Sequence, residues 1–233
     1  YEMGADVTGL ALPPNTDPSH FDLTGLKNKV RHFEGDIRDI QAVKHVFDIA
    51  KPEIVFHLAA RALVRDSYDD PKATFDTNIG GTVNVLEAIR TCPTVKSVVV
   101  ITSDKCYDNR EWVWGYREND PMGGHDPYSA SKGAAEIVCA AYRLSFFNKD
   151  GRGPHLGFAT ARAGNVIGGG DWAKDRIIPD CVRALTAKKP IIIRNPQATR
   201  PWQHVLDPLG GYLLLVARLL ENPEKYSGTW NFG

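Results

Sequence analysis

The chain has 233 residues, and its 28 lysines and arginines balance 28 aspartates and glutamates, so the formal net charge is zero. No basic stripe indicates a nucleic-acid partner, and no polybasic patch or long apolar run indicates a membrane partner. The four cysteines are scattered without a Cys-x-x-Cys pair, which predicts neither a zinc site nor a disulfide framework. We therefore expect a protein without a metal site that works in the reducing cytoplasm.

Short apolar runs alternate with helical stretches along the chain. The first runs are continuous and rich in β-branched residues, a pattern typical of a parallel sheet buried on both faces. The alternating order predicts a doubly wound, Rossmann-like α/β sheet. Predicted strands cover residues 6–10, 30–33, 54–58, 97–101, 157–162, 191–193 and 229–232, and predicted helices cover residues 40–50, 74–90, 128–148, 177–185 and 208–220.

The glycine-rich turn that usually follows the first strand of such a fold is not found in this sequence. A nucleotide-binding sheet of this type normally begins with a strand, a glycine-rich turn and a helix whose N-terminus receives the pyrophosphate. No Gly-x-Gly-x-x-Gly or Gly-x-x-Gly-x-x-Gly pattern occurs, and Gly168-Gly169-Gly170 follows the wrong strand and opens no capped helix. We therefore expect a fragment in which the first βα unit and the C-terminal tail are missing.

The pair Tyr128 and Lys132 carries the strongest chemical signal. Residues four apart lie on one face of a helix, and Asp126-Pro127 supplies an N-cap and a first helical residue, so Tyr128 falls in the first turn at the mouth of a cleft. A free phenol titrates near pH ~10, and a base that works at neutral pH needs a pKa lowered by about three units. A neighbouring ammonium favours this ionisation. The plain alternative is a half-buried tyrosine beside a solvated lysine.

A second group of polar residues, Thr102-Ser103-Asp104-Lys105, directly follows the predicted strand 97–101. Ligands of parallel α/β sheets gather at the carboxyl ends of the strands. The position therefore favours a role at a binding site over a lysine that simply reaches water.

Seven stretches together carry a resemblance: residues 35–39, 57–60, 78–82, 102–105, 128–132, 162–172 and 200–202. The chain resembles the extended short-chain dehydrogenase/reductase family that modifies nucleotide sugars. The Ser-Asp-Lys triplet, the Gly-Gly-Gly-Asp-Trp loop and the Arg-Pro-Trp segment are similar to its branch that acts on CDP-glucose. The resemblance implies NAD as cofactor, with residues 1–167 as its Rossmann-like domain. Residues 168–233 would form mainly a substrate-binding lobe interleaved with the last strands.

The resemblance also implies roles for single residues. Asp36 and Ile37 would border the adenine, and Asn78 would brace the active-site helix. The remaining cofactor contacts would come from Leu58, Ala59, Ala60, Thr102, Tyr128 and Lys132. The sugar nucleotide would meet Ser103, Asn165, Arg176, Arg194 and Arg200, because arginine suits bidentate contacts with a diphosphate.

The reaction implied is a dehydration of CDP-glucose that feeds deoxysugar biosynthesis, such as that of lipopolysaccharide O-antigen. Tyr128 would take the proton of the hexose 4-hydroxyl while Ser103 contacts the same oxygen. Asp104 would then protonate the departing C6 hydroxyl. Lys105 is either the base at C5, which requires a neutral amine, or an electrostatic stabiliser of the enolate. Relatives commonly form a homodimer or a dimer of dimers through the helices that carry Asn78 and Tyr128.

Two departures from the family pattern leave questions open. Ala11 and Leu12 stand where an acidic residue usually holds the adenosine ribose, so the choice between NAD and NADP is undecided, and Arg61 stands where glutamine is expected. The alternatives are a 4-epimerase or a dehydratase for another nucleotide, or a non-catalytic nucleotide-sensing module. The Asp104–Lys105 couple argues against an epimerase, and the intact set of Ser103, Tyr128 and Lys132 argues against a sensor.

Overall fold

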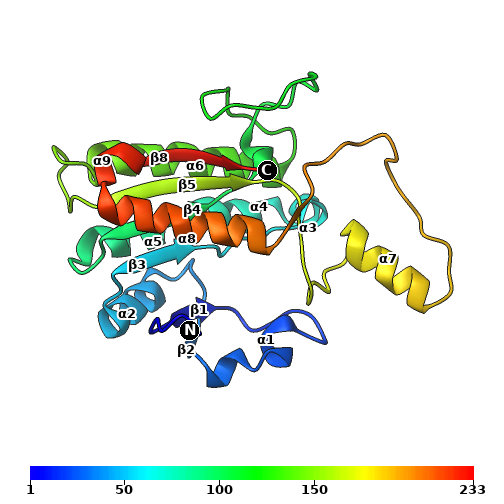
Figure 1. Cartoon of the computed structure of the whole chain (residues 1–233), viewed down its shortest axis with the longest axis horizontal. Helices are drawn as coiled ribbons and strands as arrows, with labels where there is room; N and C mark the ends of the chain where they lie inside the picture. Colours follow the sequence, from blue (N-terminus) through cyan, green and yellow to red (C-terminus); the bar gives the residue numbers. More distant parts are fainter.

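A four-stranded parallel sheet forms the centre of the molecule in a computed structural model that describes residues 1–233 (Figure 1). Its strands lie in the order β3–β4–β5–β8, and every neighbouring pair is parallel. They span β3 (Ile54–His57), β4 (Ser97–Ile101), β5 (Gly157–Ala163) and β8 (Gly228–Phe232). All-parallel pairing requires crossover connections, and helices supply them.

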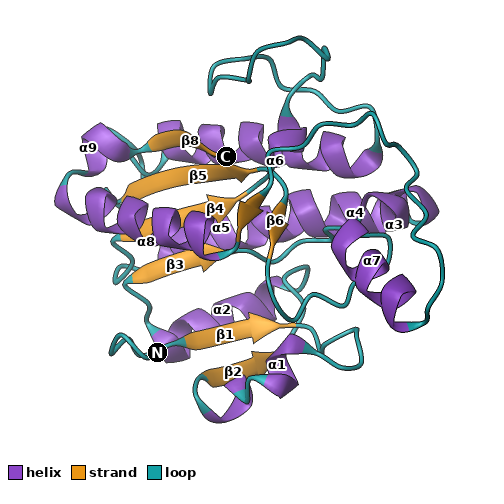
Figure 2. Cartoon of the chain, turned by 45° about the vertical axis from the view of Figure 1, so that its right-hand side comes forward, coloured by secondary structure: helices purple, strands orange, loops and turns teal.

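Two smaller parallel pairs accompany this sheet. The strands β1 (Thr8–Ala11) and β2 (Arg31–Glu34) are hydrogen-bonded to each other and to no other strand. Figure 2 shows them as a separate pair alongside β3. The short strands β6 (Val166–Ile167) and β7 (Gln203–His204) form the other pair.

Helices cover both faces of the sheet, as the doubly wound prediction requires (Figures 1 and 2). None is long and apolar enough to cross a membrane. The α-helices are α1 (His20–Leu23), α2 (Ile40–Ala50), α3 (Val64–Asp69), α4 (Pro71–Phe75), α5 (Thr82–Thr91), α6 (Pro127–Ser145), α7 (Ile177–Thr186), α8 (Leu206–Glu221) and α9 (Pro223–Tyr226). Three further helical segments differ from an α-helix: η1 (Leu26–Asn28) and η3 (Asp104–Cys106) are short 3₁₀ helices, and η2 (Asp76–Gly81) is a π-helix.

The alternation of side chains along β4 divides the interior into two cores. Val98 and Val100 point to one face and pack with α5 and α6, whereas Val99 points to the other face and packs against α8. All three valines are at most 1% exposed. Because β4 is buried on both faces, its continuous run of valines is what a central parallel strand requires.

The predicted fold class is confirmed, and most predicted elements occur within a few residues of their expected bounds. The helix predicted over 74–90 begins earlier, because Asp70 caps the turn that starts at Pro71. It then widens into the π-helical η2 before α5. Gly81 ends this segment, and an added Cβ there would lie 2.5 Å from Cδ1 of Ile37. The wider turn and the glycine together let Ile37 pack against the helix.

The strand predicted at 191–193 is wrong. Ile191, Ile192 and Ile193 lie in an irregular segment and are 41%, 85% and 52% exposed. The β-branched composition suggested a strand, but no other strand pairs with this segment, and an unpaired segment has no ladder of hydrogen bonds to stabilise it. Sequence reasoning also missed the short elements α1, α3, α9, β6 and β7.

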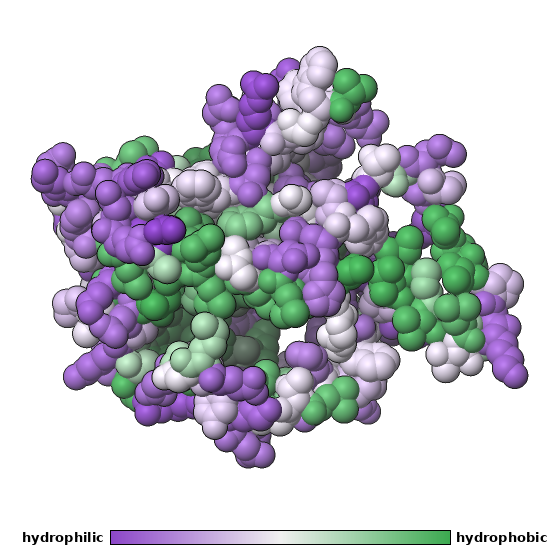
Figure 3. Space-filling model, viewed as in Figure 1, coloured by the Kyte–Doolittle hydropathy of each residue, from purple (hydrophilic) through white to green (hydrophobic).

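The division at residue 168 stays a prediction. Helix α8 and strand β8 come from the second part of the chain but belong to the central sheet, where Tyr212 and Leu215 pack against Val99. The segment between them and residue 168 contains α7, whose exposed side includes Ile178 and Leu185. Figure 3 shows this apolar side as a patch at the edge of the molecule.

Candidate active site

The first turn of α6 places Tyr128 and Lys132 at the carboxyl ends of β4 and β5. Asp126 caps the helix by accepting a hydrogen bond of 2.9 Å from the backbone N–H of Ser129, and Pro127 occupies the first helical position. The backbone N–H of Tyr128 donates to Ser67 of α3 at 3.2 Å. Tyr128 and Lys132 are 7% and 6% exposed, so the face predicted to carry both is turned inward.

The segment after β4 forms a short turn that presents polar groups beside Tyr128. Ser103 Oγ accepts a hydrogen bond from the N–H of Lys105 at 3.2 Å and donates to Asp104 Oδ1 at 3.0 Å. Ser103 is buried, whereas Asp104 and Lys105 are half-buried. The ammonium of Lys105 makes no hydrogen bond or ion pair with the protein. The structure thus brings these residues together around one end of the sheet.

Burial controls the charge state of the tyrosine. It raises the pKa of Tyr128 above the usual value, and the charge of Asp104 adds to this effect, while Ser103 and Arg176 act in the opposite direction. No hydrogen bond joins Lys132 to Tyr128. The one hydrogen bond of Lys132 Nζ goes to the carbonyl of Ile101, at 3.3 Å. The protein's own groups therefore do not produce the lowered tyrosine pKa that the sequence suggested.

Burial also acts on the lysine. It lowers the pKa of Lys132 to about 8, although Cys139 and Glu136 oppose the effect. An ammonium has three donors, and only one is used here. The remaining two suit a ligand with hydroxyl groups.

Asn78, which the resemblance implies as a brace of the active-site helix, is buried and hydrogen-bonded on two sides. Its Oδ1 accepts a hydrogen bond of 2.8 Å from the N–H of Arg61, and its Nδ2 donates to the carbonyl of Arg61 at 3.1 Å and to Ser131 Oγ at 2.8 Å. The side chain is 2% exposed and comes from the π-helical η2. One amide therefore ties the segment after β3 to the middle of the Tyr128 helix.

His57 at the end of β3 is a buried neighbour that sequence reasoning did not single out for a role. Thr82 Oγ1 donates to the carbonyl of Asn78 at 2.7 Å and lies 3.0 Å from His57 Nε2. The hydroxyl proton is thus used, and His57 Nε2 carries the proton that it donates to Thr82. Burial, with a smaller effect from the charge of Lys132, lowers the pKa of His57 to about 4.

A buried ion pair, also missed from the sequence, lies one turn beyond Lys132. Glu136 Oε2 accepts from Arg162 Nη2 at 2.8 Å, and both side chains are 4% exposed. Two sequence features mark these residues singly, without pairing them. Glu136 repeats the spacing of four that separates Tyr128 from Lys132, and Arg162 is the one charged residue of β5.

The residues predicted to border the cofactor lie at the ends of β2 and β3. Asp36 is engaged with Arg38, whose Nε and backbone N–H donate at 2.8 and 2.9 Å, and this contact lowers the pKa of Asp36. Ile37 is buried in the core. Leu58 is 54% exposed, and the small residues Ala59 and Ala60 follow it.

The residues predicted to meet the substrate are distributed along the segment from β6 to β7. The charge of Arg176 acts to lower the pKa of Tyr128, and its Nη1 lies 3.5 Å from Asp171 Oδ2. Arg194 pairs with Asp175, and Arg200 donates to the carbonyl of the preceding residue in an exposed segment. Asn165 is half-buried at the start of β6, where its carbonyl accepts a hydrogen bond from Gln203.

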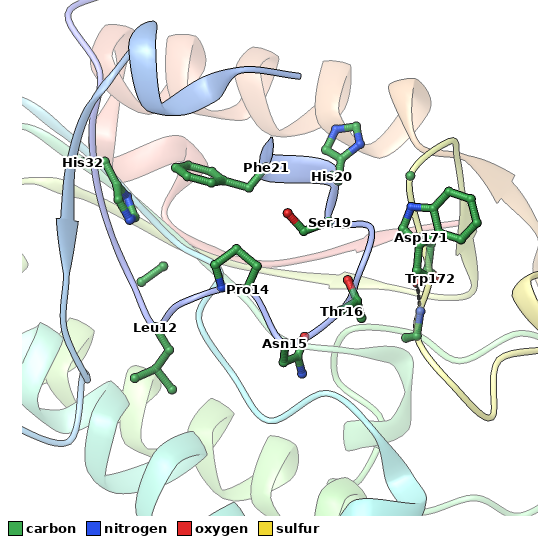
Figure 4. A pocket seen from close by; sticks show the side chains of 13 residues that line it. Leu12, Pro14, Asn15, Thr16, Ser19, His20, Phe21, His32, Asp171 and Trp172 are labelled. Carbon is green, nitrogen blue, oxygen red and sulfur yellow. Dashed lines mark hydrogen bonds between the residues drawn. The ribbon is translucent and has the colours of Figure 1, made fainter. Parts of the chain in front are cut away.

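A cavity of about 320 Å³ lies beside the end of β1 (Figure 4). It begins at Ala11 and Leu12 and reaches the loop that contains Trp172. Among the side chains drawn in Figure 4, the rings of Phe21 and His32 have centroids 4.7 Å apart. None of the predicted catalytic residues lines the cavity, so it is separate from the Tyr128 site.

Comparison with known proteins identifies the family of the chain. A model of the NAD dependent epimerase/dehydratase family matches residues 2–233. The chain belongs to this family. The match covers the end of β4, the start of α6 and the loop after β6, which are the elements that form the site described above.

Two relatives show the range of the family. The chain is 55% identical over 233 residues to CDP-glucose 4,6-dehydratase of Salmonella typhimurium, a match that covers 100% of this chain and 65% of that relative. It is 29% identical over 171 residues to CDP-paratose 2-epimerase of Salmonella typhi, covering 62% of this chain and 51% of the relative. The chain therefore spans about two thirds of the length of the first and half that of the second.

Solved structures support the fold. UDP-glucose 4-epimerase of Thermotoga maritima, solved with UDP-glucose, superposes with a TM-score of 0.81 at 20% identity, covering 100% of this chain and 70% of the other. A dTDP-glucose 4,6-dehydratase double mutant of Streptomyces venezuelae, solved with NAD, gives a TM-score of 0.78 at 21% identity, covering 98% and 66%. At these identities the likeness establishes the Rossmann-like fold.

Burial of His57 predicts a pH dependence of the free energy of unfolding. The pKa of His57 is lower in the folded protein than the ordinary value of 6.5, so only the unfolded chain takes up a proton between about pH 6.5 and about 4. As the pH is lowered from about 6.5 to about 4, the free energy of unfolding of the wild type should fall by up to about 3 kcal/mol relative to that of a His57→Gln variant. Above pH 6.5 the difference between the two should stay constant. Urea unfolding at several pH values measures this difference.

The exposed His155→Gln change is the matched control and should leave the pH dependence as in the wild type. Parallel curves for the wild type and His57→Gln would show that His57 does not titrate with unfolding.

Proposed function

We propose that the protein catalyses the NAD-dependent dehydration of CDP-glucose to CDP-4-keto-6-deoxyglucose, as a hydro-lyase. The supporting observation is the turn after β4, which places Ser103, Asp104 and the unpaired Lys105 beside Tyr128. A site that only moves hydride at C4 needs the tyrosine and the serine, whereas elimination of water also needs an acid and a base at neighbouring carbons. The relative that is 55% identical bears the name of this activity.

The residues present fit NAD. Lys132 has unused donors for ribose hydroxyls, and Ala59 and Ala60 leave space for a backbone approach after β3. The cavity at Ala11 and Leu12 lies where the resemblance places the adenosine ribose, and Asn15 and Ser19 in its wall offer polar groups. When bound, NAD supplies the hydride acceptor for C4, the hydride donor for C6 and a positive charge in its oxidised form.

Tyr128 carries the first proton transfer in this proposal. Its hydroxyl takes the proton of the hexose 4-hydroxyl, and Ser103 shares a hydrogen bond with the same oxygen. Because burial alone raises the pKa of Tyr128, phenolate forms only when positive charge surrounds it. Arg176 provides part of that charge, and we propose that Lys132, in its charged form, adds to it.

Asp104 and Lys105 act on the neighbouring carbons. A 4-ketone makes the C5 proton acidic, and water then leaves across C5 and C6. A proton returns to C5 when C6 receives hydride, which balances the product. Asp104, in its protonated form, donates to the departing C6 hydroxyl. Lys105 either removes the C5 proton as a neutral amine or stabilises the enolate as an ammonium, and its lack of an ion-pair partner is compatible with both roles.

The basic residues after β6 are proposed to bind the diphosphate. The charge of Arg176 acts on Tyr128, and Arg194 and Arg65 share the carboxylate of Asp175. A diphosphate offers the same kind of acceptor and can replace the carboxylate on an arginine. Asn165 and Arg200 complete the proposed contacts. We further propose a cytoplasmic location and a role in deoxysugar biosynthesis for lipopolysaccharide O-antigen.

Incubation of the chain with CDP-glucose and NAD tests the proposed reaction. We expect the substrate to lose one water, detected by mass spectrometry, with no net NADH in the absorbance spectrum. Tyr128→Phe should lower the rate by about 10²-fold or more, because it removes the group that accepts the proton.

The remote Tyr142→Phe change removes a hydroxyl that contacts Glu87 and should preserve the rate. An epimerised sugar of unchanged mass would indicate a 4-epimerase. Binding of CDP-glucose with no change in the sugar would indicate a sensing module.

The role of Lys105 has a separate test. If Lys105 is the base, Lys105→Met should abolish exchange of the C5 proton with deuterium from the solvent, measured by NMR of the sugar nucleotide recovered after incubation with NAD. Exchange at the wild-type rate would assign Lys105 to enolate stabilisation. Lys96→Met serves as the control, because Lys96 pairs with Glu53 at the opposite, amino end of β4.

We also propose a homodimer or a dimer of dimers that pairs through α6. Its outer side exposes Ile137, Ala141 and Leu144, and the first and last of these are each 62% exposed. Ile137→Lys should convert the assembly to monomer in sedimentation velocity, because burying a lysine at a tight helix contact is unfavourable. Ile192→Lys, in the exposed irregular segment, should leave the assembly intact, and an unchanged mass for Ile137→Lys would contradict pairing through this side.

A further inference from the structure

A cluster of buried polar groups lies one helical turn beyond Lys132 and takes no part in the proposed reaction. Its centre is the ion pair between Glu136 and Arg162, whose charged groups are 2.8 Å apart. Glu136 also accepts hydrogen bonds from the hydroxyls of Thr102 and of Thr160, the latter at 2.9 Å. Burial of two ions costs several kcal/mol for each ion, and such a pair is a poor source of stability compared with apolar packing. Its presence so close to the site therefore calls for a functional reason.

The Glu136 carboxylate and the Lys132 ammonium both lie near the end of β4, with no direct ion pair between them. Lys132 and Glu136 are four residues apart on the inner face of α6. Lys132 Nζ donates to the carbonyl of Ile101, and Glu136 accepts from the side chain of Thr102, the next residue of the chain. Glu136 is thus a negative group on the same helix face as a buried ammonium that has no ion-pair partner of its own. The other titratable groups around Lys132 are Cys139 of α6, Cys106 after β4 and His57 of β3.

We propose that Glu136 is a positioning residue whose negative charge keeps Lys132 an ammonium at the end of β4. Arg162 and the two threonines hold the carboxylate in place. The inference rests on the proposed function, because it concerns the same pair of Tyr128 and Lys132. A neutral Lys132 would lack both the charge that favours phenolate and one of the donors for ribose hydroxyls.

A purely structural role is the competing explanation. Glu136, through Arg162 and Thr160 of β5, also joins α6 to the sheet. The two roles differ in what they require: joining needs hydrogen bonds, whereas holding the lysine charged needs the negative charge. Glu136→Gln keeps the shape and an acceptor oxygen but removes the charge, and Glu136→Asp keeps the charge.

Titration of Lys132 followed by NMR of ¹³C-labelled lysine separates these roles. The Lys132 signal is identified by its disappearance in Lys132→Met. Glu136→Gln should lower the titration midpoint of Lys132 by about one pH unit or more, since an opposite charge within a few ångströms favours the charged form. Glu136→Asp should keep the midpoint close to the wild-type value. An unchanged midpoint in Glu136→Gln would overturn the proposal.

Glu87→Gln is the matched control. Glu87 of α5 also accepts from an arginine and a hydroxyl, with distances of 2.6 Å to Arg90 Nη2 and 2.8 Å to Tyr142, but it lies apart from Lys132. The same chemical change there should leave the Lys132 midpoint unmoved. If Glu136→Gln does not fold, the carboxyl ¹³C shift of wild-type Glu136 is followed through the titration of Lys132. A carboxylate signal that moves at the Lys132 midpoint, and does not move there in Lys132→Met, supports the proposal. A protonated Glu136, or a signal that does not follow Lys132, overturns it.

Kinetics add an independent measurement. In Glu136→Gln the alkaline limb of the kcat profile should move to lower pH by the same amount as the Lys132 midpoint, with little change in KM for CDP-glucose. A uniform loss of kcat at every pH, without movement of the limb, would indicate a structural role and overturn the proposal. If the protein does not dehydrate CDP-glucose, the NMR titration still tests Glu136, so failure of the proposed function is distinguishable from failure of this inference.

Discussion

One buried ionic contact, the pair of Glu136 and Arg162, joins α6 to β5 beside the site and constrains the residues around it. A charge taken out of water must be paired and hydrogen-bonded, or it neutralises or disrupts the fold. This requirement explains the composition of β5. Its residues that face α6 include Thr160 and Arg162, which bind the carboxylate, whereas the residues that face α8 are small and apolar. One strand therefore serves a polar site on one side and a dry core on the other.

The packing of α6 on the sheet also determines where the polar groups of the site lie. Ser103 and Asp104 follow β4 in a turn closed by their own hydrogen bonds, and Asn78 connects the segment after β3 to α6 through Ser131. Every predicted catalytic side chain thus comes from a strand end or a helix turn and not from a long loop. Groups on rigid elements keep their mutual geometry, which proton transfer requires.

Burial gives this geometry its electrostatic character. It raises the pKa of Tyr128 and lowers that of Lys132 to about 8, so it disfavours the phenolate and the ammonium alike. Both charged forms then depend on neighbouring charges: Glu136 for the ammonium, and cations near the tyrosine for the phenolate. A site of this kind can keep its tyrosine protonated until a ligand adds positive charge, and the proposed reaction uses that property.

The sequence by itself determined the parallel α/β class, the helices with clear caps and the residues around Tyr128. Local signals carry this information: runs of β-branched residues, Asp-Pro at a helix start, and a spacing of four. Only the tertiary structure decided that residues 191–193 form no strand, that η2 is π-helical and that Glu136, Arg162 and His57 surround the site. Each of these depends on contacts between segments far apart in the chain, as Glu136 with Arg162 shows. Pairing, desolvation and the pKa values that follow from them have no signature within a short window of sequence.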